Sequence, residues 1–474
     1  MRDEDAGAAR ALLSARAVRA RALQMLELCD EDRLAHWRLD RTRLPDVVDF
    51  TLGVMRDNYP GLDIPFHARW RHFSAGGRDR WGALAARARW KDGAARARAE
   101  FDLAIVSVLL DAGAGAGWRY REGDGTVSSR SEGLAIASLD MFAAGLFSAR
   151  KDDPLRADAE RLAAITARDL ATGFQVHCDN PLVGLAGRVD LLNRLGRACL
   201  AAPEAFARED SARPGGLFDA LAGRRRKAEE ILSAVLTHLG PIWPSRLAIA
   251  GVPLGDAWRH PQVRADDATD GVIPFHKLSQ WLSYSLIEPL QRAGVAVADI
   301  DGLTGLPEYR NGGLLVDLGA LVPKDAENAR RPQTVDSEFV VEWRALTVAL
   351  LDEIAALVRE ELKMSADALP LAKVLCGLDS TEAFEFGPPV TEDEAEECTG
   401  LLTAAVANAP ILRDMSPEAF RGTFLLRKGV LGTANGAWLL RVERVSYDVV
   451  LDRFPWTTNW IKLPWMLSEL CVEW

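Results

Sequence analysis

Phe339–Met364 reads FVVEWRALTVALLDEIAALVREELKM, and this stretch decides the fold class. Apolar residues recur at three- and four-residue steps along it, which is the period of an α-helix with a buried side. Glu342 and Arg344 interrupt the apolar text, and charges inside an apolar helix need partners that offset their desolvation. They are two residues apart, so on a helix each pairs with another segment. The stretch predicts a long core helix.

The same helical pattern recurs along most of the chain. It covers Ala8–Leu28, Leu84–Asp111, Leu134–Ser148, Ala157–Thr172, Leu217–Leu239 and Leu278–Ala293. Segments rich in Gly and Pro join these helices. Strand signals are few, although residues 118–129 (WRYREGDGTVSS) place aromatic and β-branched residues around Gly-Asp-Gly and predict a short hairpin. We therefore predict a mainly α, multi-helix globular domain.

Composition excludes several classes of protein. The length of 474 residues allows about three domains of ordinary size, and a hydrophobic fraction of 48% is enough to bury a core. A net charge of -11 argues against a broad nucleic-acid-binding surface, which needs basic residues in excess. The six cysteines are scattered and contain no Cys-x-x-Cys pair, and no stretch has the form of an export signal or a membrane span. We expect a cytoplasmic protein with reduced thiols, no nucleic-acid partner and no membrane partner.

The character of the sequence changes near its C-terminal end. Asp379–Glu397 is acidic and contains two consecutive prolines, as a linker or a helix entry does. Phe424–Val450 alternates apolar and polar residues on both sides of a Gly-containing turn, a pattern typical of paired strands. We predict a helical domain at residues 1–374 and a small α+β segment with a β-hairpin at residues 375–474.

A first polar patch interrupts helical text at Ile273–Gln280 (IPFHKLSQ). Pro274 suits a helix start. A helix from there would align four side chains along one side: Lys277, Gln280, Trp281 and Tyr284. His276 is either a catalytic residue or an ordinary histidine at a helix end or in the core.

A second patch, Leu306–Gly313 (LPEYRNGG), is a turn that holds a carboxylate, a phenol and a guanidinium before a helix. Glu308 and Arg310 either belong to a site or form a pair that stabilises the turn. Together with Glu342 and Arg344, these residues indicate a polar site between helices.

A third candidate is residues 111–120 (DAGAGAGWRY). It is not a dinucleotide-binding fingerprint, because Gly-x-Gly-x-x-Gly is not matched and a helix precedes it where a strand should. The glycines allow either close approach of the backbone to a ligand or a flexible turn. Ser131 is a possible cap for a helix that begins at Leu134. Asp111, Trp118 and Glu132 join the candidate substrate-binding residues.

No Ser-His-Asp order, His-Glu-x-x-His motif or P-loop is present, so a metal hydrolase is disfavoured. One histidine beside one cysteine at His177-Cys178, with no second cluster, is more often structural than metal-binding. We expect no metal and no cofactor.

Seven strings resemble one family: LLDAGAGAGWRY, RSEGLAIASLDMF, DNPLVGLAGRVDLLNRLG, RPGGLFD, IPFHKLSQWLSYSLIEPL, GLPEYRNGGLLVDLG and VEWRALTVALLDEIA. They are similar, in order and up to about Val374, to the uracil catabolism proteins of the Urc/Urg type found in fungi and bacteria. The resemblance implies an enzyme that acts on a ring-opened pyrimidine ribonucleotide, in a route that ends in urea and a three-carbon acid.

Three strings also resemble queuosine-salvage N-glycosidases: FHKLSQ, PEYRNGGLLVDLGAL and EWRALTVALLDEI. That likeness implies a fold related to helix-hairpin-helix glycosylases and hydrolysis of an N-ribosidic bond, although related families need not share a reaction. Those glycosidases have aspartates at the positions of Glu308 and Ser285, so the first carboxylate is kept and the second is lost. An amidohydrolase that acts on the ureido group is an alternative.

The resemblance implies roles for the candidate residues. A carboxylate stabilises or captures the oxocarbenium-like centre when a ribose C–N bond breaks, and Glu308 is the candidate. Tyr309 and His276 are candidates for contacts with ribose hydroxyls or the leaving nitrogen. Lys277 and Arg310 suit a 5′-phosphate. The remaining substrate-binding candidates are Gln280, Tyr284, Glu342, Arg344, Asp111, Trp118 and Glu132, with Trp118 and Tyr284 as an apolar wall.

The C-terminal strings LLTAAVANAP, SPEAFRGTFLLRKGVL, GAWLLRVERVSYDVVLDRFPW and WIKLPWMLSELCVEW resemble the end of contractile injection system tape-measure proteins. They replace the ending that the uracil catabolism family has. Either a genuine fusion joins the two parts, or the sequence is a chimera of joined reads or a frame error. The resemblance implies a second function, assembly with injection-system subunits through residues 375–474.

Overall fold

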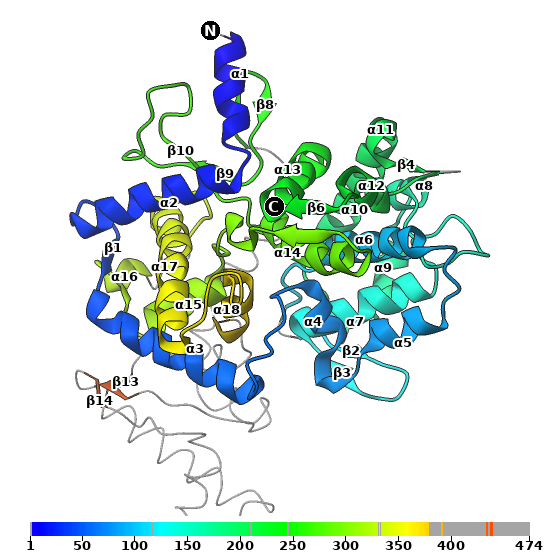
Figure 1. Ribbon diagram of the computed structural model, residues 1–474, viewed down its shortest axis with the longest axis horizontal. Helices are drawn as coiled ribbons and strands as arrows, with labels where there is room; N and C mark the ends of the chain where they lie inside the picture. The colour runs from blue at the N-terminus through cyan, green and yellow to red at the C-terminus, as the bar shows by residue number, and fades with distance from the viewer. Residues whose placement is uncertain are drawn as a thin grey trace, which may run out of the picture.

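The computed structural model describes residues 2–115, 117–208, 211–243, 246–329, 331, 333–378, 390–391, 433–434 and 437–438. Helices dominate this part of the chain, and its strands are short pairs, so the predicted mainly α fold class is confirmed. Residues 2–378 form the helical body that Figure 1 shows in ribbon form. No described helix combines the length and the apolar character that crossing a bilayer requires.

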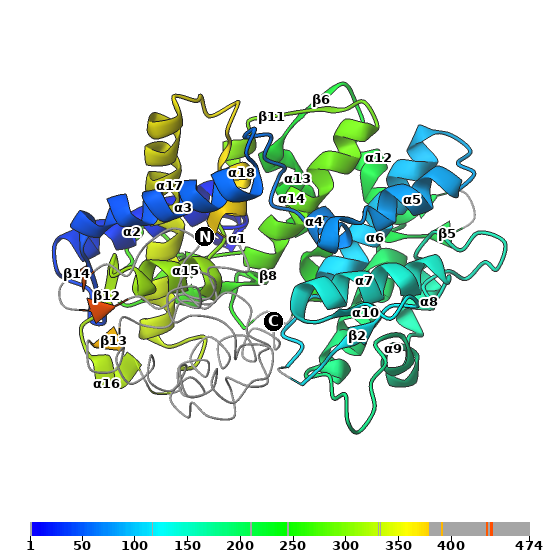
Figure 2. The ribbon, with the colours of Figure 1, turned by 90° about the horizontal axis from the view of Figure 1, so that it is seen from below.

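The body contains two groups of helices with α14 between them, and both Figure 1 and Figure 2 show this arrangement. The first group consists of α2 (Ala15–Asp30), α3 (Leu44–Asn58), α15 (Tyr309–Asp317), α16 (Ala326–Ala329), α17 (Glu338–Leu362) and α18 (Leu371–Leu378). The helix α17 is the centre of this group and packs against α2, α3, α15 and α18. The short helix α1 (Arg2–Ala11) precedes the group and extends away from it.

The second group follows α3 in the chain. Its members are α4 (Arg69–Phe73), α5 (Arg80–Arg87), α6 (Gly93–Leu109), α7 (Arg130–Ala143), α8 (Ala159–Ala163), α9 (Ala167–Gly173), α10 (Leu185–Ala201), α11 (Pro203–Phe206), α12 (Leu217–Leu221) and α13 (Ala228–Leu239). The helix α14 (Lys277–Arg292) packs against α4, α6 and α13. The first turn of α14 faces the first group, so this helix connects the two halves.

Most of the strands of the body pair with the next strand along the chain, and two pairs join segments that are distant in sequence. They are β1 (Trp37–Leu39), β2 (Tyr120–Arg121), β3 (Val127–Ser128), β4 (Ala207–Arg208), β5 (Ser211–Ala212), β6 (Arg225–Lys227), β7 (Ala248–Ile249), β8 (Val252–Pro253), β9 (Ala257–Arg259), β10 (Val272–Pro274), β11 (Ala296–Ala298) and β12 (Leu321–Pro323). The predicted hairpin at residues 118–129 is confirmed, because β2 and β3 pair antiparallel. Two pairs bridge long loops: β1 with β12, and β6 with β11 in parallel.

Two of the predicted helices match the structure closely. Leu278–Ala293 and Phe339–Met364 correspond to α14 and α17, with ends that differ by no more than two residues. Most of the other long helices that the sequence predicts are interrupted in the structure, because capping residues start a new helix inside them. Ser14 caps α2, Asp92 caps α6 and Thr166 caps α9, each by accepting a backbone N–H with its side chain.

Two local predictions are also wrong. Pro274 does not start a helix: it is the last residue of β10, where its fixed φ suits extended backbone, and α14 begins three residues later. Ser131 does not cap a helix, because α7 already begins at Arg130.

The C-terminal segment is described only at β13 (Val390–Thr391), β14 (Thr433–Ala434) and β15 (Ala437–Trp438). β15 pairs antiparallel with both β13 and β14. The β14–β15 pair lies inside the region where the sequence predicts paired strands. The rest of that prediction, and the acidic stretch after Leu378, lie outside the described residues.

Candidate functional site

The first two polar patches of the sequence meet where α14 and α15 begin, and Arg344 of α17 joins them there. The Lys277 ammonium lies 3.3 Å from a carboxylate oxygen of Glu308, and their side chains are 26% and 12% exposed. Lys277 is the first residue of α14, where the positive end of the helix dipole disfavours a cation. Glu308 precedes α15, where the dipole favours its carboxylate. The ion pair offsets the unfavourable position of Lys277.

The carboxylate of Asp256 connects this pair to α17. It accepts two hydrogen bonds from the Arg344 guanidinium, at 3.0 and 2.8 Å, and a third from the backbone N–H of Lys277 at 3.1 Å. Trp258 Nε1 donates a fourth, at 2.9 Å. Burial opposes ionisation of Asp256, but Arg344 and these donors outweigh it and hold the pKa of Asp256 below its ordinary value. A fully bonded carboxylate of this kind positions its neighbours.

Strand pairing brings Asp256 to this place. Ala257 pairs with Pro274 in the β9–β10 ladder, so the residue before β9 lies beside the residues that follow β10. The backbone N–H of Phe275 accordingly donates to the Asp256 carbonyl at 2.8 Å. Asp256 was not among the residues expected at the site, because it lies in a stretch (GVPLGDAW) that has no periodic signal.

Arg344 also fixes the segment that carries Glu308. Its Nε donates to the Pro307 carbonyl at 3.2 Å, and its guanidinium lies 4.2 Å from the ring centroid of Phe275. The close approach of α15 to α17 depends on Gly312, where a Cβ would lie 2.7 Å from both Trp343 Nε1 and Thr347 Oγ1. Of the two glycines at the end of the Leu306–Gly313 patch, Gly312 is therefore required by packing.

Gln280 and Tyr284, both on α14, hold the chain segment that leads to Glu308. Gln280 Oε1 accepts the backbone N–H of Thr304 at 2.8 Å, and its amide nitrogen donates to the Thr304 hydroxyl. The Tyr284 hydroxyl donates to the Thr304 carbonyl at 2.8 Å. Both side chains are fully buried. They therefore set where residues 304–308 run.

His276 lies immediately before α14 in the left-handed region, with φ of 48°. Its side chain is buried, and its Nε2 lies 2.9 Å from the Leu12 carbonyl. Because a carbonyl only accepts, Nε2 carries the hydrogen. Burial lowers the pKa of His276, which favours this neutral ring. His276 thus connects the start of α14 to the N-terminal segment.

Glu342 points away from the Lys277–Glu308 pair, although it is only two residues from Arg344. Its carboxylate accepts the backbone N–H groups of Ala35 and His36, both at 3.0 Å, and lies 3.3 Å from His260 Nε2. The side chain is fully buried. Glu342 therefore secures the chain between α2 and β1.

Asp111 and Glu132 belong to a second polar cluster, around Arg69 at the start of α4. The Arg69 Nη1 lies 3.1 Å from Asp111 Oδ2, and its guanidinium lies 5.6 Å from the ring centroid of Trp281. Burial lowers the pKa of Arg69, while the charges of Asp111 and Glu132 act in the opposite direction. Trp281 is one helical turn from Lys277, so α14 connects the two clusters.

The remaining candidates lie in different surroundings. Trp118 is fully buried in the second group, where its Nε1 donates to the Phe174 carbonyl at 2.9 Å. Arg310 is half-buried in the first turn of α15. Tyr309 is the first residue of that helix, and its side chain lies outside the described part of the chain.

A family model described as "Protein of unknown function (DUF1688)" matches residues 11–381. This match covers the helical body from the last residue of α1 onward. The chain belongs to the DUF1688 family.

Two relatives of this family align over most of their length. The protein named urg3 of Schizosaccharomyces pombe is 39% identical over 373 residues, which are 77% of this chain and 90% of that protein. Uracil catabolism protein 4 of Lachancea kluyveri is 36% identical over 366 residues, 69% of this chain and 82% of that protein. The resemblance of the seven strings to uracil catabolism proteins is therefore confirmed.

A second family model, the contractile injection system tape measure protein, matches residues 338–474. It overlaps the DUF1688 match at residues 338–381, which include α17 and α18. These two helices pack against α2, α3 and α15. In the structure they are part of the DUF1688 body.

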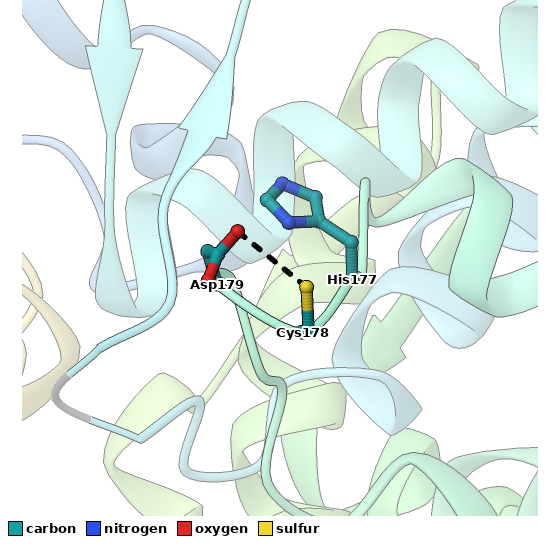
Figure 3. Close-up of side chains that lie close together, drawn as sticks. All are labelled: His177, Cys178 and Asp179. Carbon is teal, nitrogen blue, oxygen red and sulfur yellow. Dashed lines mark hydrogen bonds between the residues drawn. The ribbon is translucent and has the colours of Figure 1, made fainter.

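Among the described residues, three side chains lie within metal-binding reach of one another outside the site. His177, Cys178 and Asp179, drawn in Figure 3, offer donor atoms within 4.8 Å of each other. All three are exposed and consecutive in the chain, and Cys178 donates to the Asp179 carboxylate at 3.4 Å. No further observation points to a metal there, so we assign none.

Proposed function

We propose that this protein is an enzyme of uracil catabolism that hydrolyses the N-ribosidic bond of a ring-opened ureido-ribose or its phosphate. The name of the Lachancea kluyveri relative supports the pathway. The observation that carries the reaction is the Glu308 carboxylate at the start of α15, partly exposed and 3.3 Å from the Lys277 ammonium. Contacts through Asp256 and Arg344 hold both residues in place.

The reaction breaks the bond between the ribose anomeric carbon and a urea nitrogen. Positive charge develops on the sugar ring, and the Glu308 carboxylate stabilises it. Water adds its oxygen to the anomeric carbon, and the leaving nitrogen takes up a proton, so the products are urea and ribose. Tyr309 follows Glu308 directly and is a candidate contact for the ribose hydroxyls. His276 has a positioning role, because its ring bonds the Leu12 carbonyl.

A 5′-phosphate would be attracted to the same place. Lys277 is the cation nearest to Glu308 among the contacts described above, and Arg310 lies in the first turn of α15. The N-termini of α14 and α15 add backbone N–H groups and the positive ends of two helix dipoles. Substrate with a phosphate is therefore expected to bind more tightly than substrate without one.

Replacement of Glu308 tests the reaction. We expect Glu308→Gln to lower kcat for release of urea and ribose from ribosylurea by about 10²–10⁴-fold, because the charge that stabilises the transition state is lost. Glu353→Gln is the control, since Glu353 pairs with Arg41 on α17's exposed side. Full activity of the Glu308 variant would refute the assignment. Ammonia appearing before urea would indicate the alternative, an amidohydrolase acting on the ureido group.

A second candidate function rests on the tape-measure match at residues 338–474. A C-terminal segment of that type would assemble with subunits of a contractile particle. We propose a domain boundary after Leu378, the buried last residue of α18, in place of the boundary after residue 374 that the sequence predicts. Co-sedimentation of the full chain with sheath and tube subunits would support assembly, and its absence from particle fractions would refute it. Sequencing the gene across this boundary on one DNA molecule separates fusion from chimera.

A further inference from the structure

Three polar atoms in the second cluster are buried without a hydrogen-bond partner. They are Arg69 Nη2, Asp111 Oδ1 and Trp281 Nε1. Arg69 is fully buried, Trp281 is 6% exposed, and the Asp111 side chain is 8% exposed. Folded proteins rarely leave such groups unsatisfied, because each has lost its bonds to water. Three together indicate a place that binds something.

The three atoms belong to one constellation. Arg69 Nη1 holds the other oxygen of Asp111 at 3.1 Å, and the Arg69 guanidinium lies over the Trp281 ring at 5.6 Å from its centroid. Arg69 is fixed further by Nε, which donates to the Ser107 hydroxyl at 2.7 Å, and by the Ser131 carbonyl. The guanidinium is thus anchored through Nε and Nη1, while Nη2 is buried without a hydrogen-bond partner.

The chemistry of these atoms defines the ligand. Arg69 Nη2 and Trp281 Nε1 are donors, and the carboxylate of Asp111 only accepts. Their complement is a small group with one carbonyl oxygen and at least one N–H, which is an amide or a ureido group. We infer that Arg69, Asp111 and Trp281 form the subsite for the ureido end of the substrate. This inference rests on the proposed function, which requires a ureido leaving group.

The position along α14 agrees with this assignment. Trp281 lies one turn after Lys277, whose ammonium contacts Glu308. A ribose at Glu308 can therefore direct its anomeric nitrogen along α14 toward Trp281. The sugar and its phosphate lie at the helix N-termini, and the urea portion lies at the second cluster.

A binding experiment tests the subsite without any turnover. We expect millimolar N-methylurea to shift the indole N–H resonance of Trp281 in the full-length ¹⁵N-labelled protein, with the resonance identified by its loss in Trp281→Phe. The Trp343 indole donates to the Gly312 carbonyl and its resonance should stay in place. Tetramethylurea has no N–H and should bind more weakly. An unmoved Trp281 resonance would overturn the inference.

Kinetics separate this inference from the proposed reaction. We expect Trp281→Phe to raise KM for ribosylurea about tenfold with little change in kcat, because one hydrogen bond to the bound group is lost. Asp111→Asn, which replaces an acceptor by a donor, should abolish the preference for N-methylurea over tetramethylurea. Trp81→Phe is the matched control, since its indole donates to Glu100. If ribosylurea is not cleaved but Trp281 still responds to N-methylurea, the proposed reaction is refuted and the ureido subsite is supported. If ribosylurea is cleaved and Trp281→Phe leaves its KM unchanged, the reaction is supported and the subsite is refuted.

Discussion

Replacing Asp256 by Asn probes the contact that holds the candidate site together. The Asp256 carboxylate accepts four hydrogen bonds, two of them from Arg344. The two side chains of this pair are 11% and 14% exposed, so its loss leaves a nearly buried guanidinium facing an amide. Breaking such a pair costs roughly 3–5 kcal/mol. We therefore expect a folded-to-unfolded ratio about 10²–10⁴-fold smaller.

Urea denaturation measures this loss as a lower midpoint with an unchanged slope. Its pH dependence has a definite sign. The folded-state pKa of Asp256 is depressed, so its contribution is present above the unfolded pKa of about 3.9 and disappears as pH falls through the folded value. Asp256→Asn should therefore differ most from the parent near neutral pH. Asp152→Asn is the control, because the Asp152 side chain is exposed and pairs with Arg150, and it should change the free energy of unfolding by less than about 1 kcal/mol. An equally small effect at Asp256 would refute the reasoning.

Two further predictions concern packing and thiol chemistry. Gly312→Ala should lower the free energy of unfolding by about 1–3 kcal/mol, because its methyl group would meet Trp343. Gly313→Ala, with open space around it, should leave that free energy unchanged or raise it, and equal effects of the two substitutions in urea denaturation would contradict the packing role of Gly312. In the native protein, a maleimide should label the exposed Cys178 before the buried Cys199, because burial raises the pKa of the Cys199 thiol. Mass spectrometry of the digested protein measures the order of labelling, and labelling of Cys199 first would contradict this prediction.

The fold class and the ends of α14 and α17 could be predicted because their apolar period is uninterrupted. The break inside the predicted helix Leu217–Leu239 could not be predicted from the sequence. It contains β6, whose partner β11 lies some 70 residues later, and no local pattern announces a pairing at that distance. The break inside Leu84–Asp111 was visible in principle, since Asp92 before Gly93 is a typical helix cap.

The candidate site shows the same division. Lys277, Glu308 and Arg344 could be expected to meet, because each is a charge placed in apolar helical text. Asp256 could not, since only the β9–β10 pairing places it beside α14. Glu342 was expected to bind substrate with Arg344, but it turns toward His260, because residues two apart on a helix point to different sides. Whether these side chains bind substrate stays a prediction.

The contacts of α17 have a consequence for how the protein is made. The helix α2 packs against α17, and Glu342 accepts the N–H of Ala35 across a separation of 307 residues. A ribosome that adds about 5–20 residues per second reaches α17 roughly 15–60 s after it has made α2. For that time Val18, Met25 and the other residues of α2 that are buried in the finished protein have no α17 to cover them. We therefore expect nascent chains to expose this side of α2 until α17 has been made, and translation that stalls before residue 338 leaves a product without the helix at the centre of its first group.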